Sequence, residues 1–147
     1  MSVRRVLVVH DDTDFRRIYR AALEHAGFDV VDTDDPIEAR QAFDLGSIAL
    51  VVCDLYIRMV ADESFVSWLK RDPRAATVPV MVVTAWGSES HRIVATNCGA
   101  DTFLRLPVAP KTLLEEVQRV LGPLPPESAF VSRLTSPRPE ALSPRLR

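Results

Sequence analysis

The sequence has little of what marks several specialised classes of protein. Its 147 residues include only two cysteines, Cys53 and Cys98, which form neither a CxxC motif nor a spacing suited to a metal. Its net charge is −2, so no overall positive field is available to attract nucleic acid. No apolar run approaches the length of a membrane span. We therefore expect a reduced, cytoplasmic protein that binds neither nucleic acid nor membrane.

We also expect neither a secretion signal nor internal repeats. The apolar run after Arg4 and Arg5 stops at His10-Asp11-Asp12, and this run is too short for a signal peptide. The composition, 47% hydrophobic and 26% charged, is ordinary for a single globular domain with its own core.

Proline and arginine gather at the carboxyl end of the chain. Six of the eleven prolines lie between Gly122 and Arg147, together with four arginines and two glutamates. This composition favours an extension that forms no packed element. We predict a folded domain over residues 3–121 and a flexible Pro/Arg-rich tail over residues 122–147.

Apolar strand patterns alternate with helical patterns along the predicted domain. Strands are predicted at residues 6–9, 28–31, 48–53, 79–84 and 102–106. Helices are predicted at residues 14–25, 35–43, 65–69, 88–98 and 110–121, with stops at Gly27, Gly99 and Gly122. The alternation predicts an α/β fold whose parallel sheet has helices on both faces. A closed eight-unit barrel needs roughly 250 residues, so we expect an open, doubly wound, five-stranded flavodoxin-like sheet, (βα)5, with strand order 2-1-3-4-5.

Polar residues follow these strands at the edge where open parallel sheets bind ligands. Asp54 ends an apolar strand, and that stretch alone suits a chemical role and a capping role equally well. The predicted order makes the first and third strands neighbours, so Asp11 and Asp54 should face one pocket. Two carboxylates about 4 Å apart repel by about 4 kcal/mol at an effective dielectric constant of about 20, so the pair needs a proton or a cation. Mg²⁺ suits such oxygen ligands, and with the Thr84 hydroxyl nearby the set favours phosphoryl transfer to a carboxylate.

In this order, the motifs resemble those of a response regulator receiver domain of an atypical kind. The resemblance spans residues 3–121 and rests on Val-Val-His-Asp-Asp at 8–12, the Asp54 strand, Val-Thr-Ala at 83–85, Gly-Ala-Asp at 99–101 and Leu-Pro at 106–107. It implies two-component signalling, in which a sensor histidine kinase or phosphotransfer protein passes a phosphoryl group to an aspartate with the help of Mg²⁺. A face built from the fifth strand and the last helices would then change its protein partners, and a homodimer through the last two helices is left open. Such a module is not an enzyme.

The resemblance also implies roles for single residues near the metal. Asp54 matches the phosphoacceptor, and Asp11, Asp54 and the backbone carbonyl of Tyr56 match the ligands of Mg²⁺. His10 and Asp12 are further candidates at the metal, and the alternative for Asp12 is an amino-terminal helix residue.

Other matched positions lie on the fourth and fifth strands. Thr84 matches the hydroxyl that binds a phosphoryl oxygen, and Phe103 matches an aromatic residue that turns inward on activation. The peptide bond between Leu106 and Pro107 is expected to be cis, as is usual in the family.

Two positions depart from the family pattern. His10 stands where the family usually has an acid, and Leu106 stands where it usually has a lysine that pairs with the phosphoryl group. A charge-assisted hydrogen bond is worth about 1.5–3 kcal/mol, so Leu106 forfeits an interaction of that size. Arg105 should not replace the lysine, because alternation along the strand turns it to the other face with Phe103. The loop at residues 57–59 also differs.

His10 should also change the electrostatics of the pocket. A histidine is a poorer ligand for Mg²⁺ than an acid, so we expect weakened metal binding. Because Asp11, Asp12 and Asp54 are nearby, we expect the imidazole to be biased toward its protonated form, with a tolerated polar residue as the alternative.

Two functions compete on these observations. The first is a receiver that accepts a phosphoryl group on Asp54 and thereby switches protein–protein contacts. The second is a degenerate pseudo-receiver that acts as a phosphorylation-independent interaction module, which the changes at His10 and Leu106 favour. A phosphatase-type enzyme is disfavoured, because Tyr56 stands where its second carboxylate would be.

Overall fold

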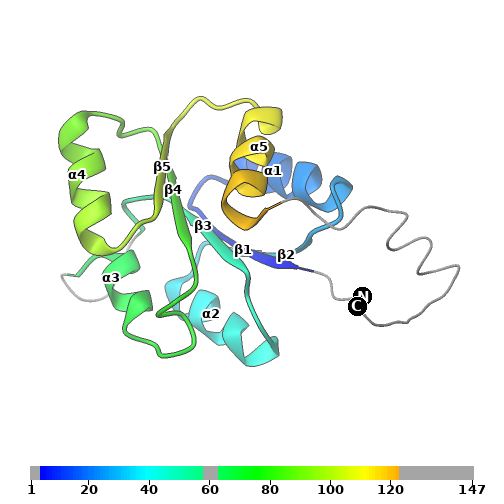
Figure 1. Ribbon diagram of the computed structural model, residues 1–147, viewed down its shortest axis with the longest axis horizontal. Coiled ribbons are helices and arrows are strands. Elements are labelled where there is room, and N and C mark those ends of the chain that lie inside the picture. The colour runs from blue at the N-terminus through cyan, green and yellow to red at the C-terminus, as the bar shows by residue number, and fades with distance from the viewer. Residues whose placement is uncertain (1–3, 58–62, 123–147) are drawn as a thin grey trace, which may run out of the picture.

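Parallel strands form one sheet in the order β2-β1-β3-β4-β5, which confirms the predicted fold class and strand order (Figure 1). The computed structural model describes residues 4–57 and 63–122. The strands are β1 (Arg5–Val9), β2 (Asp29–Thr33), β3 (Leu50–Cys53), β4 (Val80–Thr84) and β5 (Thr102–Arg105). The helices are α1 (Thr13–His25), α2 (Pro36–Gln41) with the 3-10 turn η1 (Ala42–Leu45), α3 (Phe65–Lys70), α4 (Glu89–Cys98) and α5 (Pro110–Leu121).

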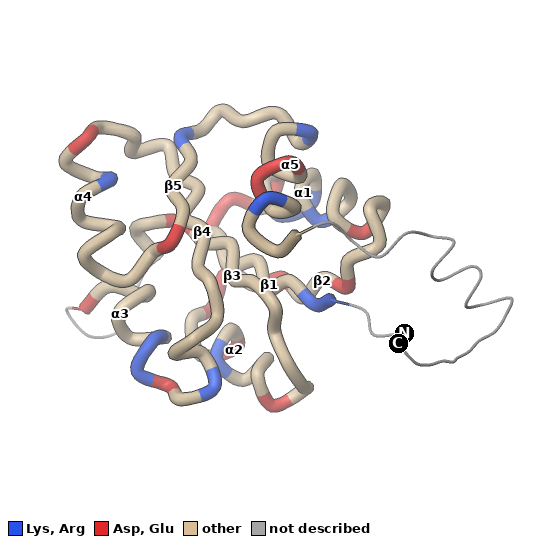
Figure 2. The backbone as a smooth tube through the Cα atoms, in the orientation of Figure 1, with Lys and Arg blue, Asp and Glu red and all other residues tan. Residues whose placement is uncertain are grey.

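Helices cover both faces of the sheet, α1 and α5 on one face and α2, α3 and α4 on the other (Figure 1). Successive strand residues point to opposite faces, so each strand contributes to two apolar layers. The layer beneath α1 and α5 includes Val8, Val52, Val83, Phe15 and Leu113. The layer beneath α2, α3 and α4 includes Val9, Cys53, Val82, Phe65 and Ala95. Strands β3 and β4 carry no charged residue, as expected for strands buried on both faces (Figure 2).

The strand register decides which residues leave the sheet side by side. Val9 pairs with Cys53, so His10 and Asp54 follow these strands as neighbours. The backbone N–H of Asp54 donates to the carbonyl of Val9 at 3.2 Å, which continues the pairing by one step. Between β4 and β5 the backbone N–H of Leu106 donates to the carbonyl of Thr84 at 2.8 Å, which likewise continues the strand pairing. The four strand ends therefore share one edge of the sheet.

Most predicted boundaries differ from the structure by one or two residues, as for the third strand, which begins at Leu50 and not at residue 48. The second strand runs from Asp29 to Thr33, later than the predicted range 28–31. Its polar end stays in the sheet because Arg16 and Arg20 pair with the carboxylate of Asp32. The predicted helix 35–43 is an α-helix only as far as Gln41. The residues that follow, Ala42–Leu45, form the 3-10 turn η1.

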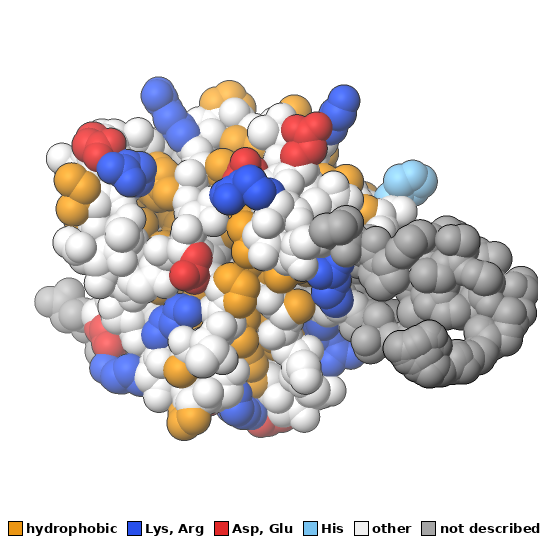
Figure 3. Space-filling model, viewed as in Figure 1, with side chains coloured by type: hydrophobic (Ala, Val, Ile, Leu, Met, Phe, Trp, Pro, Cys, Tyr) orange, Lys and Arg blue, Asp and Glu red, His pale blue; other side chains and the backbone are white. Residues whose placement is uncertain are grey.

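Most of the predicted tail, residues 123–147, lies outside the described residues, as do residues 58 and 59 of the altered loop. Within the described part of the chain, no helix combines the length and the apolar character that crossing a membrane requires. On the face seen in Figure 3, side chains of both charges are interspersed among hydrophobic ones.

Candidate functional site

The candidate site lies where β1, β3 and β4 end. His10 follows β1, Asp54 follows β3, and Thr84 is the last residue of β4. The Asp54 side chain is 17% exposed, so it stays in reach of solvent. Thr84 is fully buried, and its hydroxyl accepts a hydrogen bond from the backbone N–H of Trp86 at 3.2 Å.

His10 is the side chain that the structure brings to Asp54. Its Nε2 atom lies 3.4 Å from Oδ2 of Asp54 and 3.3 Å from the carbonyl oxygen of Val83. The ring stacks on Phe15 with 3.9 Å between the ring centroids, and it is only 3% exposed. His10 therefore joins the ends of β1, β3 and β4 in a buried position.

Burial lowers the pKa of His10 below its ordinary value, and the opposing effects of Asp54, the Val83 carbonyl, Asp12 and Asp11 are smaller. The expectation of an imidazole biased toward its protonated form is therefore wrong. The three carboxylates are indeed near the ring, but the loss of water around a charged imidazole outweighs them. The sequence suggested the acids and gave no measure of the burial.

The other two acids of the His-Asp-Asp segment have different surroundings. Oδ1 of Asp12 accepts hydrogen bonds from the backbone N–H groups of Asp14 and Phe15, at 2.9 and 3.2 Å, so Asp12 caps α1. Asp11 is exposed and lines a pocket together with Asp34, Asp35 and Pro36. That Asp11 or Asp12 binds a metal stays a prediction.

No three His, Cys, Asp or Glu side chains in the described ranges are close enough together to hold a metal ion. The carboxylates of Asp54 and Asp11 remain as hard oxygen donors, and Oδ2 of Asp54 already faces His10. Mg²⁺ commonly keeps several waters and takes only one or two protein carboxylates, so this donor set suits Mg²⁺ better than a metal that needs an all-protein cage.

Aromatic rings from separate segments lie beside the site. Tyr56 contacts Trp86 and His91 edge-on, with ring centroids 6.0 and 5.8 Å apart. Trp86 and Tyr56 are both exposed. Trp86 lies two residues after Thr84 in the sequence, whereas no sequence pattern indicates that Tyr56 and His91 join it. The Tyr56 carbonyl stays a predicted metal ligand.

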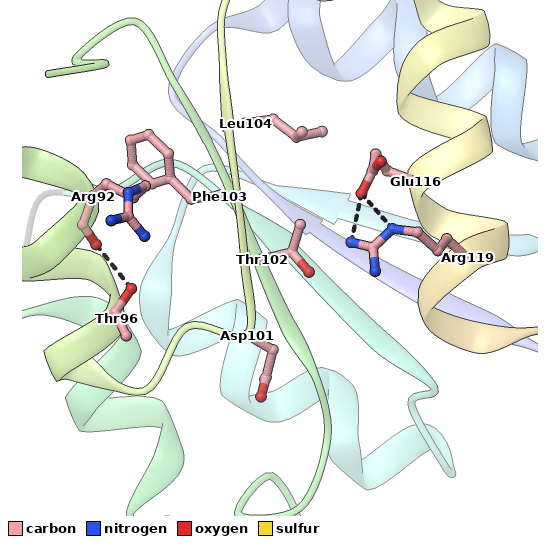
Figure 4. Close-up of a pocket in the computed structure, with 8 residues that line it drawn as sticks. All are labelled: Arg92, Thr96, Asp101, Thr102, Phe103, Leu104, Glu116 and Arg119. Atoms are coloured by element: carbon pink, nitrogen blue, oxygen red, sulfur yellow. Dashed lines mark hydrogen bonds and ion pairs between the residues drawn. The ribbon is translucent and has the colours of Figure 1, made fainter. Parts of the chain in front are cut away.

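The end of β5 is apolar on the side toward α1 and α5. Leu106 packs against the layer that contains Phe15 and Val83, and the Leu106–Pro107 peptide is cis, as predicted. Arg105 is exposed and lies against Gly87. Figure 4 shows Phe103 on the α4 side of β5 and Leu104 on the α5 side, which confirms the predicted alternation. No charged side chain of β5 is therefore directed to the place that the lysine takes in the family.

A second concave surface lies between α4 and α5, across β5 (Figure 4). Its arginines pair within their own helices, Arg92 with Glu89 and Arg119 with Glu116. Phe103 lines this surface and also packs against the apolar layer beneath α4. The predicted switch residue thus sits between the sheet and an open face, and its inward turn on activation stays a prediction.

Comparisons with known proteins agree with this architecture. The family model for the response regulator receiver domain matches residues 6–118. The transcriptional regulatory protein GltR of Pseudomonas aeruginosa is 31% identical over 121 residues, which is 80% of this chain and 49% of that protein. The phosphate regulon transcriptional regulatory protein PhoB of Escherichia coli is 29% identical over 123 residues, 84% of this chain and 54% of that protein. This chain thus spans about half the length of these curated relatives.

Solved structures give the same fold. The chemotaxis response regulator CheY4 of Vibrio cholerae has a TM-score of 0.74 and 25% identity, covering 82% of this chain and 100% of that chain. A response regulator receiver protein from Pseudomonas putida has a TM-score of 0.69 and 28% identity, covering 81% of this chain and 98% of that chain.

Proposed function

The chain belongs to the response regulator receiver domain family, and on that basis we propose that it accepts a phosphoryl group on Asp54 and thereby switches its protein contacts. The donor is a sensor histidine kinase or a phosphotransfer protein. A carboxylate oxygen of Asp54 attacks phosphorus, the phosphorus–nitrogen bond of the donor's phosphohistidine breaks, and the departing imidazole takes up a proton. The product is an aspartyl phosphate.

The observation that carries this proposal is the placement of Asp54. It follows β3, the strand buried between β1 and β4, yet its carboxylate remains partly exposed to an approaching donor. The buried hydroxyl of Thr84 belongs to the neighbouring strand, where a donor to a phosphoryl oxygen is needed. A preorganised donor of this kind needs no reorganisation when charge moves onto the oxygen.

Mg²⁺ would be held by Asp54, Asp11 and the Tyr56 carbonyl in this proposal. When bound, the ion neutralises charge between the carboxylate and the incoming phosphoryl group. His10 should make the ion bind more weakly than an acid at the same position would. Asp12 is a poor further ligand, since capping of α1 already engages its Oδ1 atom.

We further propose that the output face is formed by α4, β5 and α5. Ile93 and Val94 of α4 are exposed apolar side chains, and Phe103 connects this face to the apolar layer beneath it. The partner is a downstream protein or a second copy of the chain. Direct contact with nucleic acid is not part of the proposal, and neither is an enzymatic reaction beyond the phosphoryl transfer. Cys53 and Cys98 are free, which fits work in the reducing cytoplasm.

One alternative is favoured by a specific observation. Nε2 of His10 lies 3.4 Å from Oδ2 of Asp54, and Leu106 is partly buried against the core at the place of the family's lysine. A pseudo-receiver would tolerate both changes, because its contacts would not depend on phosphate. Its interaction face would be the same one.

Intact mass spectrometry tests the proposal. The protein is incubated with Mg²⁺ and acetyl phosphate, with Asp54→Asn as the control. We expect one added phosphoryl group on the wild type and none on the variant. A wild type that stays unmodified over a range of donors would favour the pseudo-receiver.

A further inference from the structure

The side chain of Arg16 ties three elements together beside the candidate site. Its Nη1 atom donates a hydrogen bond to the backbone carbonyl of His10, directly after β1. Nε donates to Oδ2 of Asp32 in β2 at 3.2 Å, and Nη2 donates to the hydroxyl of Thr13 in α1 at 3.5 Å. The Arg16 side chain is only 16% exposed, so solvent and salt screen these contacts less than they screen a surface pair. The guanidinium group thus fastens the end of β1 to β2 and to α1 at once.

The stability of α1 does not explain an arginine at this position. Arg16 lies in the first turn of the helix, where the helix dipole favours acidic side chains. A guanidinium group is suited to a bridge instead, because it presents several N–H donors in one rigid plane. The position of Arg16 therefore makes sense through what the side chain contacts outside α1.

Asp11 follows directly on the carbonyl that Arg16 holds. The Asp11 side chain is exposed, so its place depends on how the backbone on either side of it is fixed. The backbone N–H of His10 donates to the carbonyl of Thr33 at 3.1 Å, and the carbonyl of His10 accepts from Arg16. On the other side of Asp11, Asp12 caps α1. Arg16 thus completes the set of contacts that fixes the backbone around Asp11.

Resting on the proposed function, we propose that Arg16 is a positioning residue, which holds the backbone at Asp11 where the carboxylate can bind Mg²⁺. The carbonyl that Arg16 holds belongs to the peptide that joins His10 to Asp11. Charge alone predicts the opposite effect, because a guanidinium group repels a cation and its removal would strengthen the binding of Mg²⁺. Weaker binding after the removal of Arg16 is therefore the mark of positioning.

Arg20 provides a matched control on the same helix. Its Nη1 atom pairs with Oδ1 of Asp32, and its Nε atom donates to Glu24 at 3.0 Å. Both arginines bring one positive charge to the carboxylate of Asp32. Of the two, Arg16 is the one that is bonded to the carbonyl of His10. Because Arg20 still pairs with Asp32 after the substitution Arg16→Met, we expect this variant to fold.

An NMR titration with MgCl₂, in protein without a phosphodonor, tests the proposal. The dissociation constant of Mg²⁺ is measured from the backbone amide signals of Asp11 and Asp54. Arg16→Met should raise this constant about tenfold, as for other residues that orient a metal ligand. Arg20→Met should leave it within about twofold, because an exposed ion pair contributes little. Before Mg²⁺ is added, Arg16→Met should already shift the Asp11 amide signal, and Arg20→Met should not.

Three results would overturn the inference: an Arg16→Met protein that binds Mg²⁺ as tightly as the wild type or more tightly, equal weakening by both substitutions, or a wild type whose Asp11 signal ignores Mg²⁺. The proposed function fails separately. Mg²⁺ binding that depends on Arg16, in a protein that takes up no phosphoryl group, would support the inference and defeat the proposed function. A phosphoryl group on Asp54, with Mg²⁺ binding that ignores Arg16→Met, would do the reverse.

Discussion

Strands β3 and β4, in the middle of the sheet, end in residues that match the family, whereas the flanking strands β1 and β5 end in residues that do not. Asp54 and Thr84 belong to the first pair of strand ends. His10 and Leu106 belong to the second pair. The carboxylate and the hydroxyl have been kept, while an acid and a lysine on either side of them are missing.

The two changed residues have more in common than their departure from the family. His10 stacks on Phe15, and Leu106 packs against the same apolar layer. Neither residue favours a positive charge at the site, because burial lowers the pKa of His10 and leucine has no ionisable group. The difference teaches that the flanks contribute packing in place of charge, so the proposed phosphoryl transfer would rely on the Thr84 hydroxyl and on a bound metal.

The largest effect is expected from the packing of the changed flank. Phe15→Ala removes the ring under His10 and should lower the free energy of unfolding by about 3–5 kcal/mol, as for other buried aromatics. Urea denaturation measures this change. Ile18→Ala is the control on the same helix, where the side chain is 50% exposed and a change within about 0.5 kcal/mol is expected. Equal effects of the two substitutions would mean that Phe15 does not support the flank.

The next effect concerns the strand ends that match the family pattern, Asp54 and Thr84. Thr84→Ala removes the buried hydroxyl and should slow phosphorylation of Asp54 on the order of 10²-fold, as for other donors to a developing charge. Thr84→Ser keeps the hydroxyl and should retain most of the rate. Time courses of intact mass measure both variants. A Thr84→Ala rate near that of the wild type would mean that the hydroxyl at the end of β4 has no role in phosphorylation.

A smaller effect is expected for the metal. Asp11→Asn should raise the Mg²⁺ concentration that gives half-maximal phosphorylation by roughly tenfold, a loss typical of weakened metal sites. Asp34→Asn is the matched control, because Asp34 lines the same pocket and is not a predicted ligand. If both variants shift the Mg²⁺ requirement alike, Asp11 acts only through the general charge of the pocket.

The smallest effect is expected at Arg105, the cation nearest in sequence to the missing lysine. Its side chain is exposed and lies against Gly87, so Arg105→Ala should leave the phosphorylation rate within about twofold of the wild type and stability within about 0.5 kcal/mol. The same time courses and urea denaturation check this. A large loss of rate would show that Arg105 of β5 supplies a cation to the site. It would contradict the statement that the flanking strands bring no charge.

The fold could be predicted from the sequence because its signals are local. Apolar runs such as the one before Asp54 mark strands buried on both faces, and Gly99 ends α4 in a left-handed conformation that favours glycine. The end of β2 could not be predicted, since the ion pairs of Asp32 with Arg16 and Arg20 are contacts between separate elements.

The candidate site was predictable in its positions and not in its contacts. Alternation along β5 correctly turned Arg105 away from Leu106. The lowered pKa of His10 was missed, because it comes from burial, and the ring of Phe15 in the following helix stacks on the imidazole. Phe15, five residues after His10, was the one available signal that an aromatic ring could cover the imidazole.

The central claim is that Asp54 and Thr84 support phosphorylation without the family's acid and lysine. The most direct test compares the wild type with a variant that has both of these residues. His10→Asp combined with Leu106→Lys returns the acid and the lysine, and a regained charge-assisted hydrogen bond should make the variant roughly ten- to hundredfold faster. The measurement is the phosphoryl group added per protein over time, with the same acetyl phosphate and Mg²⁺. We predict that the wild type acquires one phosphoryl group on Asp54, more slowly than the variant. A variant that accepts the group while the wild type never does would contradict the account and identify the natural chain as a pseudo-receiver.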